Sequence, residues 1–141
     1  MESRPAWDDY FGKIAEVVSS RATCKRRKIG VVIVDKEHHI ISTGYNGSPP
    51  GQPHCNDVGC LLIDKRCRRT IHGDVNSIIH CQDRNALIGS TMYIYGGSPC
   101  TPCAQAIVSA RITRVVCSEE YPEPQAIEFL KQANIEVVIK K

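Results

Sequence analysis

Apolar residues recur along this chain first at the spacing of a helix and then at the spacing of strands. From Trp7 to Ser19 they follow the three-to-four-residue period of a helix with one buried face. The segment 29–34 is rich in β-branched residues and predicts a strand. The polar segment 35–38 predicts a turn, and 39–43 a returning strand. We therefore expect a helix followed by a β-hairpin.

The second half of the chain alternates between helix and strand patterns. The predicted helices cover 74–87, 103–110 and 126–133, and the predicted strands cover 91–95, 114–117 and 135–139. A hairpin followed by such alternation indicates the α/β class, with one mixed sheet and helices on both faces. A length of 141 residues without a repeat or a linker suits a single domain, 1–141.

The segment between these halves, residues 44–59, predicts a long loop. It contains four glycines and three prolines. Loops of this length in a compact domain are usually functional or held in place. Cys55 and Cys60, inside and just after the loop, suggest what holds it.

Composition and charge exclude several classes of protein. The formal net charge of +3 is too small to indicate a nucleic-acid binder, but it suits a small anionic substrate. The first residues lack an apolar secretory segment, and the longest apolar run is too short to span a bilayer, so we expect a cytoplasmic protein without a membrane partner. In a reducing compartment, eight cysteines favour metal binding over disulfides.

Three residues have the spacing of a catalytic zinc site. Cys100 and Cys103 can point at one ion from the first turn of a helix, and His72 can supply a third ligand from the start of another helix. Two sulfurs and one nitrogen leave the fourth tetrahedral position open for water, as in catalytic zinc sites. A small structural zinc knot is the alternative. The pattern His-x-Asp followed by Pro-Cys-x-x-Cys resembles the signature of zinc-dependent base deaminases.

Over nearly its whole length the chain resembles the deoxycytidylate deaminases. The resemblance is carried by Asn76 and by the segments 21–30, 42–49, 53–55, 67–72 and 99–103. It implies a three-layer α/β/α sandwich with a five-stranded mixed sheet. It also implies hydrolytic deamination of dCMP to dUMP and ammonia, with zinc activating the water that attacks C4 of the base.

The resemblance further implies roles for individual residues. A carboxylate beside the zinc, here Asp74, shuttles protons to N3 and to the leaving amine. Asn46 is expected near the deoxyribose, and Arg26 and Tyr121 near the 5′-phosphate. A guanidinium is a sound phosphate partner.

The chain departs from the family at the catalytic carboxylate. The family has Glu where this chain has Asp74, and Ala where it has Gly73. The loss of one methylene withdraws the carboxylate by roughly 1 Å. Asp74 can still serve if Gly73 lets the backbone move closer. The alternatives are a site for another nucleotide, such as a 5-substituted dCMP or a purine nucleotide, and a catalytically weak or inactive nucleotide-binding zinc protein.

Four further cysteines suggest a second zinc. Cys24, Cys55, Cys60 and Cys67 flank or occupy the long loop, and a four-cysteine site is closed and structural. His54 is a possible substitute ligand. Buried free thiols are the alternative explanation.

The resemblance also implies regulation and assembly. Deoxycytidylate deaminases are typically hexamers that dCTP activates with Mg²⁺ and dTTP inhibits. The resemblance places the nucleotide effector near a loop that here contains Gly44, Tyr45, Asn46 and Gly47. Backbone N–H groups of a glycine-rich loop suit phosphates.

Overall fold

A five-stranded mixed sheet forms the centre of the molecule. The computed structural model describes residues 3–25, 27–64, 66–120 and 122–140. The strand order is β2-β1-β5-β6-β7. The strands are β1 (Gly30–Val34), β2 (Ile40–Tyr45), β5 (Thr91–Tyr95), β6 (Arg114–Cys117) and β7 (Glu136–Ile139). Strand β1 runs antiparallel to β2 and β5, whereas β5, β6 and β7 are parallel. This confirms the predicted mixed sheet.

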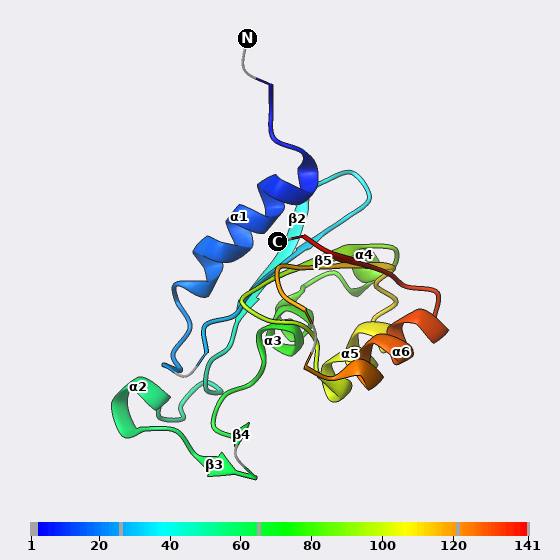
Figure 1. Cartoon of the computed structure of the whole chain (residues 1–141). Helices are drawn as coiled ribbons and strands as arrows, with labels where there is room; N and C mark the ends of the chain where they lie inside the picture. The colour runs from blue at the N-terminus through cyan, green and yellow to red at the C-terminus, as the bar shows by residue number, and fades with distance from the viewer. Residues whose placement is uncertain (1–2, 26, 65, 121, 141) are drawn as a thin grey trace.

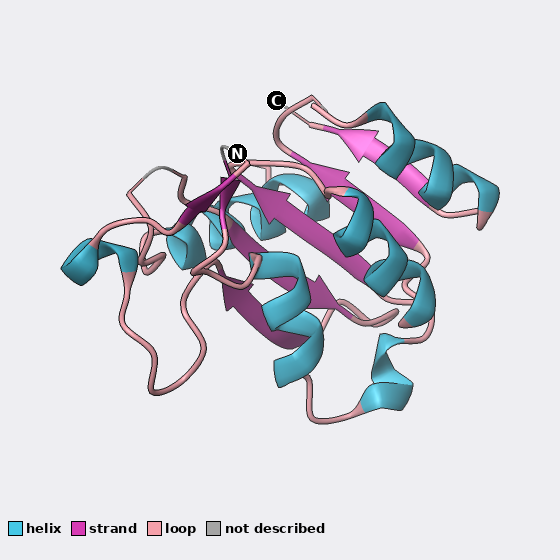
Figure 2. Ribbon diagram, turned by 90° about the horizontal axis from the view of Figure 1, so that it is seen from below, coloured by secondary structure: helices cyan, strands magenta, loops and turns pink. Residues whose placement is uncertain are grey.

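Helices cover both faces of the sheet, as Figure 2 shows. Helix α1 (Trp7–Ser19) packs Phe11 and Ala15 against Val32, Val34 and other side chains of one face. Helices α3 (Gly73–His80), α5 (Thr101–Ser109) and α6 (Pro124–Gln132) contribute to the larger core on the opposite face. The three-layer α/β/α arrangement is therefore confirmed. No helix within the described residues is long and apolar enough to cross a membrane.

The start of α3 is fixed tightly against β2. A Cβ added at Gly44 would lie 2.5 Å from the backbone nitrogen of Ser77 and 2.6 Å from the carbonyl oxygen of Gly73. Only a glycine permits so close an approach of helix to strand. The position of His72, which is the N-cap of α3, follows from this packing.

The helix predicted over 74–87 is wrong as a single element. Helix α3 ends at His80, and a separate short helix α4 (Arg84–Leu87) follows. The break has a local cause, because the Asp83 side chain accepts a hydrogen bond of 3.0 Å from the backbone N–H of Asn85 and so caps α4. The other predicted helices and strands are present, with ends that differ by a few residues at most.

The segment predicted as a long loop contains one short element and leads into two more. These are α2 (Cys55–Val58), β3 (Leu62–Ile63) and β4 (Arg66–Cys67), which pairs antiparallel with β3. The three elements lie to one side of the central sheet (Figure 1). We call residues 54–67 the cysteine lobe. Its apolar side chains at Val58, Leu61, Leu62 and Ile63 are exposed, so the described part of this lobe has no hydrophobic core of its own.

Candidate active site and cysteine cluster

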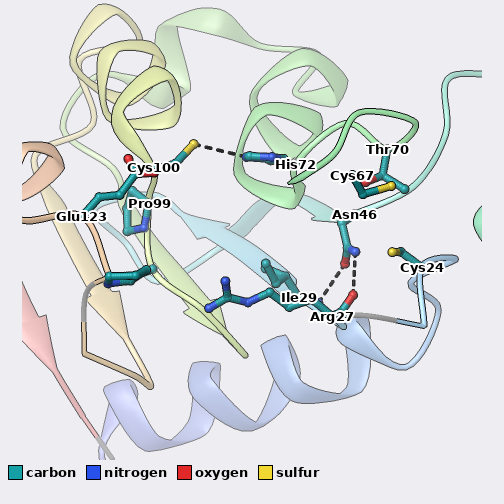
Figure 3. Close-up of a pocket in the computed structure, with 12 residues that line it drawn as sticks. Cys24, Arg27, Ile29, Asn46, Cys67, Thr70, His72, Pro99, Cys100 and Glu123 are labelled. Carbon is teal, nitrogen blue, oxygen red and sulfur yellow. Dashed lines mark hydrogen bonds between the residues drawn. The ribbon is translucent and has the colours of Figure 1, made fainter. Parts of the chain in front are cut away.

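The three residues predicted to bind a catalytic zinc lie together. His72 is the N-cap of α3, Cys100 is the N-cap of α5, and Cys103 lies in the first turn of α5. The Nδ1 atom of His72 lies 3.2 Å from the Sγ of Cys100 and 3.1 Å from the Sγ of Cys103, and the two sulfurs are 3.1 Å apart. Figure 3 shows His72 and Cys100 facing each other at the pocket wall.

The donor set fits a zinc ion with one open position. One imidazole nitrogen and two sulfurs are ligands that zinc prefers, and all three lie within 4.8 Å of one another. The hydrogen bond between Cys100 and Cys103, together with His72, lowers the pKa of the Cys100 thiol to about 4 although burial opposes the shift. The hydrogen bond to Cys100 in turn raises the pKa of His72. The cluster therefore stabilises a thiolate, the form of cysteine that binds metal.

Asp74 lies next to this cluster and is buried. Its side chain is 5% exposed, and one carboxylate oxygen accepts a hydrogen bond of 3.2 Å from the backbone N–H of Val75. Burial raises the pKa of this carboxyl group, although a hydrogen bond with Cys103 opposes the shift. An acid in such surroundings holds its proton more firmly than an exposed aspartate does.

A pocket of about 350 Å³ opens beside the ligand cluster. The described residues that line it are Cys24, Arg27, Ile29, Asn46, Cys67, Thr70, His72, Ser98, Pro99, Cys100, Pro122 and Glu123. In Figure 3, His72 and Cys100 lie on one side of this pocket and Arg27 and Ile29 on the other. Arg26 and Tyr121, which were predicted near the phosphate, lie outside the described residues.

Asn46 lines the pocket, but its side-chain amide bonds the main chain. Its Oδ1 accepts a hydrogen bond of 2.8 Å from the backbone N–H of Ile29, and its Nδ2 donates one of 2.7 Å to the carbonyl oxygen of Arg27. Asn46 therefore fixes the backbone that carries Arg27 and Ile29. Its predicted contact with the deoxyribose stays a prediction.

The segment predicted to bind effectors holds α3 in place. Gly47 and Ile71 exchange two backbone hydrogen bonds of 3.2 and 2.8 Å, directly before His72. The carbonyl oxygen of Tyr45 accepts a hydrogen bond of 3.0 Å from the side chain of Asn76. Effector binding at this segment stays a prediction.

Arg27 is a candidate that sequence reasoning missed. Its Nε donates a hydrogen bond of 3.2 Å to the carbonyl oxygen of Gly96, and its Nη2 lies 3.6 Å from a carboxylate oxygen of Glu119. A Cβ added at Gly97 would lie 3.2 Å from that Nη2, so the missing side chain makes room for the guanidinium. Arg27 and Ile29 are two residues apart, and this strand-like spacing could have placed them on one face.

The four cysteines predicted to bind a second zinc also lie together. The Sγ atoms of Cys24 and Cys60 are 3.6 Å apart, those of Cys55 and Cys67 are 3.4 Å apart, and all four lie within 4.8 Å of one another. Burial raises the pKa of the Cys67 thiol, but hydrogen bonds from the backbone N–H of Arg69 and from neighbouring thiols lower it to about 6. Among the described residues, this group and the His72 cluster are the two that could hold a metal ion, and His54 belongs to neither.

This chain is similar in sequence to a known family and to individual proteins. The family described as cytidine and deoxycytidylate deaminase zinc-binding region matches residues 5–119. ComE operon protein 2 of Bacillus subtilis is 36% identical over 95% of this chain and 71% of its own length. Deoxycytidylate deaminase of Mycobacterium phage D29 is also 36% identical, over 84% of this chain and 98% of its own length.

A solved structure extends the similarity to three dimensions. The dCMP deaminase from the cyanophage S-TIM5, in complex with dCMP and dUMP, superimposes with a TM-score of 0.82 at 27% sequence identity. The match covers 99% of this chain and all of that one.

Proposed function

Because the chain belongs to the cytidine and deoxycytidylate deaminase zinc-binding family, we propose that it hydrolyses dCMP to dUMP and ammonia. One observation carries the proposal: His72, Cys100 and Cys103 converge within 4.8 Å at the wall of a pocket that is large enough for a nucleotide. The similarity to a deaminase solved with dCMP and dUMP supports the choice of substrate.

The residues of the site divide the chemistry between them. His72, Cys100 and Cys103 would hold a zinc ion, which when bound would supply an activated water at neutral pH by lowering the pKa of that water to about 7. Asp74, buried beside Cys103, takes the two protons of that water in turn and delivers one to N3 of the base and the other to the leaving amine.

Gly73 compensates in part for the short side chain of Asp74. A Cβ added at Gly73 would lie 3.3 Å from a methyl group of Val31 and 3.4 Å from the backbone nitrogen of Asn46. These contacts are tight, so an alanine would press the start of α3 away from the sheet. Gly73 therefore allows the backbone of Asp74 to lie closer to the sheet by a few tenths of an ångström, which offsets only part of the missing methylene.

Arg27 is our candidate for binding the 5′-phosphate. It is the pocket-lining arginine among the described residues, and Gly96 and Asn46 hold its side chain and its backbone in place. A guanidinium that is already oriented suits a phosphate, because it loses little freedom on binding. Arg26 and Tyr121 remain candidates for the same role on the basis of the resemblance.

Zinc in the four-cysteine cluster would be structural. Four sulfurs leave no open position, so such a zinc would hold the cysteine lobe to the segment that carries Cys24. Assembly into a homo-hexamer, activation by dCTP with Mg²⁺ and inhibition by dTTP are proposed from the family resemblance alone. Sedimentation tests the assembly, and dCMP turnover measured with and without each nucleotide tests the regulation.

Ammonia release from a panel of substrates tests the proposed reaction. The zinc-loaded protein is incubated with dCMP, 5-methyl-dCMP, dAMP and deoxycytidine. We expect the highest kcat/KM for dCMP. A preference for 5-methyl-dCMP or dAMP would contradict the proposal. It would indicate that the space left by the shorter side chain of Asp74 accommodates a bulkier base. Zinc-loaded protein without turnover of any substrate would indicate a nucleotide-binding protein instead.

The same assay tests Arg27. Arg27→Met should lower kcat/KM for dCMP by about ten- to a hundredfold, because a charged hydrogen bond to phosphate is lost, and leave that for deoxycytidine unchanged. Arg69→Met is the matched control, since its Nε bonds the carbonyl oxygen of Gly59 in the cysteine lobe. If Arg26→Met lowers kcat/KM for dCMP but not for deoxycytidine, and Arg27→Met does not, then Arg26 binds the 5′-phosphate.

A further inference from the structure

The N-terminus of α5 carries both cysteines of the His72 cluster but has no capping hydrogen bond from the side chain of its own N-cap residue. Cys100 is the N-cap residue, and its side chain makes no capping hydrogen bond. Its sulfur contacts His72 and Cys103 instead. Pro102 has no N–H group. The N–H of Thr101, between the two cysteines, therefore needs an acceptor from elsewhere in the chain.

Glu123 supplies that acceptor from 22 residues away. Its Oε2 accepts a hydrogen bond of 2.9 Å from the backbone N–H of Thr101 and another of 3.0 Å from the Thr101 hydroxyl. A carboxylate at a helix N-terminus is stabilised by the unpaired N–H groups and by the helix dipole. Figure 3 shows Glu123 beside Cys100 and Pro99.

The backbone of Glu123 is itself held in place. It is the N-cap residue of α6, directly before Pro124. Helix α6 packs in the same core as α5, through Ala126 and Leu130 of α6 and Ile107 of α5. The carboxylate therefore joins the first turn of α5 to a helix that the core already fixes.

We propose that Glu123 is a positioning residue for the catalytic zinc site. It acts through Thr101 and holds Cys100 and Cys103 in the orientation that binds the ion, without touching the metal. The inference rests on the proposed function only in so far as zinc occupies the His72 cluster. Outer partners of metal ligands typically contribute about ten- to a hundredfold to metal affinity.

Zinc retention tests this role without reference to any substrate. A chromogenic chelator is added to the zinc-loaded protein, and the release phase that is absent from His72→Ala is assigned to the catalytic site. Glu123→Ala should speed that phase by about tenfold or more. Glu123→Gln keeps an oxygen acceptor in the same place and should restore most of the retention. Glu128→Ala, an exposed change on the same helix, should leave the phase unchanged.

A double-mutant cycle separates positioning from a general loss of stability. Thr101→Ala removes one of the two hydrogen bonds and should speed zinc release less than Glu123→Ala does. In the double variant, Thr101→Ala should add less to the rate of zinc release than it does alone, because Glu123 has already lost its contacts. Thermal unfolding shows which variants are folded at the assay temperature.

Two outcomes would overturn the proposal. One is unchanged catalytic-zinc release in both Glu123→Ala and Thr101→Ala. The other is unchanged release together with lower turnover of dCMP in Glu123→Ala alone, which would make Glu123 a substrate-binding residue. A chain that retains zinc as expected but does not deaminate dCMP would contradict the proposed function and leave the role of Glu123 intact.

Discussion

The two clusters of metal-binding side chains differ in how the fold supports them. The donors of the His72 cluster lie at the N-termini of α3 and α5, two helices that pack in the main core. In the four-cysteine cluster, Cys55 and Cys67 lie on elements of four and two residues, whereas Cys24 and Cys60 lie outside helices and strands. Three of these donors belong to a lobe with exposed apolar side chains. If both clusters bind zinc as proposed, three ligands suffice where the core already positions the donors, and a fourth position stays open for chemistry. Four ligands would then hold the chain where the core does not position the donors.

The clusters nevertheless share one pocket. Cys24 and Cys67 of the four-cysteine cluster line it together with His72 and Cys100. We therefore expect damage to the His72 cluster to remove the chemical step. Damage to the four-cysteine cluster should distort the pocket and leave the chemistry in place.

The largest expected effect comes from removing a ligand of the His72 cluster. His72→Ala and Cys100→Ser should each lower kcat by at least about 10⁴-fold, because the pKa of the attacking water returns from about 7 towards that of free water. Metal analysis should show the loss of one zinc per chain, while circular dichroism stays close to that of the parent protein. Retention of activity in either variant would exclude this cluster as the catalytic centre.

Asp74 should show a large effect on rate without an effect on metal. Asp74→Asn keeps the size of the side chain but cannot carry the proton, so kcat should fall by about 10²–10⁴-fold. Zinc content should stay the same. If ammonia release survives this change, the proton is carried by another group.

Asp74→Glu, alone and combined with Gly73→Ala, sharpens this test of the short carboxylate. The pair introduces the residues that the family resemblance assigns to these two positions. If Gly73 offsets the missing methylene, the double variant should be more active than Asp74→Glu alone. Equal activities would show that the two positions are independent.

The sequence predicted the core-supported cluster better than the lobe, for a physical reason. The ends of α3 and α5 follow from hydrophobic periodicity and turn residues, which act locally, and His72, Cys100 and Cys103 lie at those ends. The lobe has no such periodicity, so α2, β3 and β4 could not be predicted, although the cysteine spacing did indicate that the four sulfurs gather.

Contacts between residues far apart in the sequence could not be predicted either. Arg27 lines the pocket because the Gly96–Gly97 turn accepts its guanidinium, some 70 residues away, and Glu123 caps α5 across 22 residues. The single helix predicted over 74–87 failed because its periodicity outweighed the capping tendency of Asp83.

Removing a ligand of the four-cysteine cluster should have a smaller effect on activity. Cys67→Ser should lose the other zinc and expose residues 54–67 to proteolysis, because the lobe lacks a core. We expect KM for dCMP to rise by about tenfold with a smaller change in kcat, since only the pocket wall moves. Cys81→Ala, a buried cysteine of neither cluster, should keep both ions. A loss of kcat as large as that of His72→Ala would show that the clusters are not separable.

The smallest effect on activity is expected from changing an ion pair on the face of the sheet that α1 covers. This pair gives a baseline for the predictions on both clusters. Arg114 donates two hydrogen bonds of 2.8 Å to the two carboxylate oxygens of Asp8, and the Tyr93 hydroxyl donates another of 2.9 Å. The Arg114 hydrogen bonds hold the pKa of Asp8 below its usual value of 3.8, although burial opposes the shift. At neutral pH, Asp8→Asn should lower the free energy of unfolding by about 1.5–3 kcal/mol.

The pH dependence of that loss identifies its cause. Since the pKa of Asp8 is lowered in the folded state, its contribution is complete above about pH 4 and disappears as the pH falls through the folded-state pKa. The difference in stability between the parent protein and Asp8→Asn should therefore shrink in acid, measured by urea unfolding from pH 7 to pH 2.5. Asp9→Asn is the control, because the Oδ1 of Asp9 lies 3.7 Å from the Nζ of Lys140 in an exposed ion pair. This substitution should change the free energy of unfolding by less than about 1 kcal/mol. Both variants should keep both zinc ions and full turnover. If Asp8→Asn releases either ion, the two clusters depend on the opposite face of the sheet, and the contrast between a core-supported and a ligand-supported site would no longer hold.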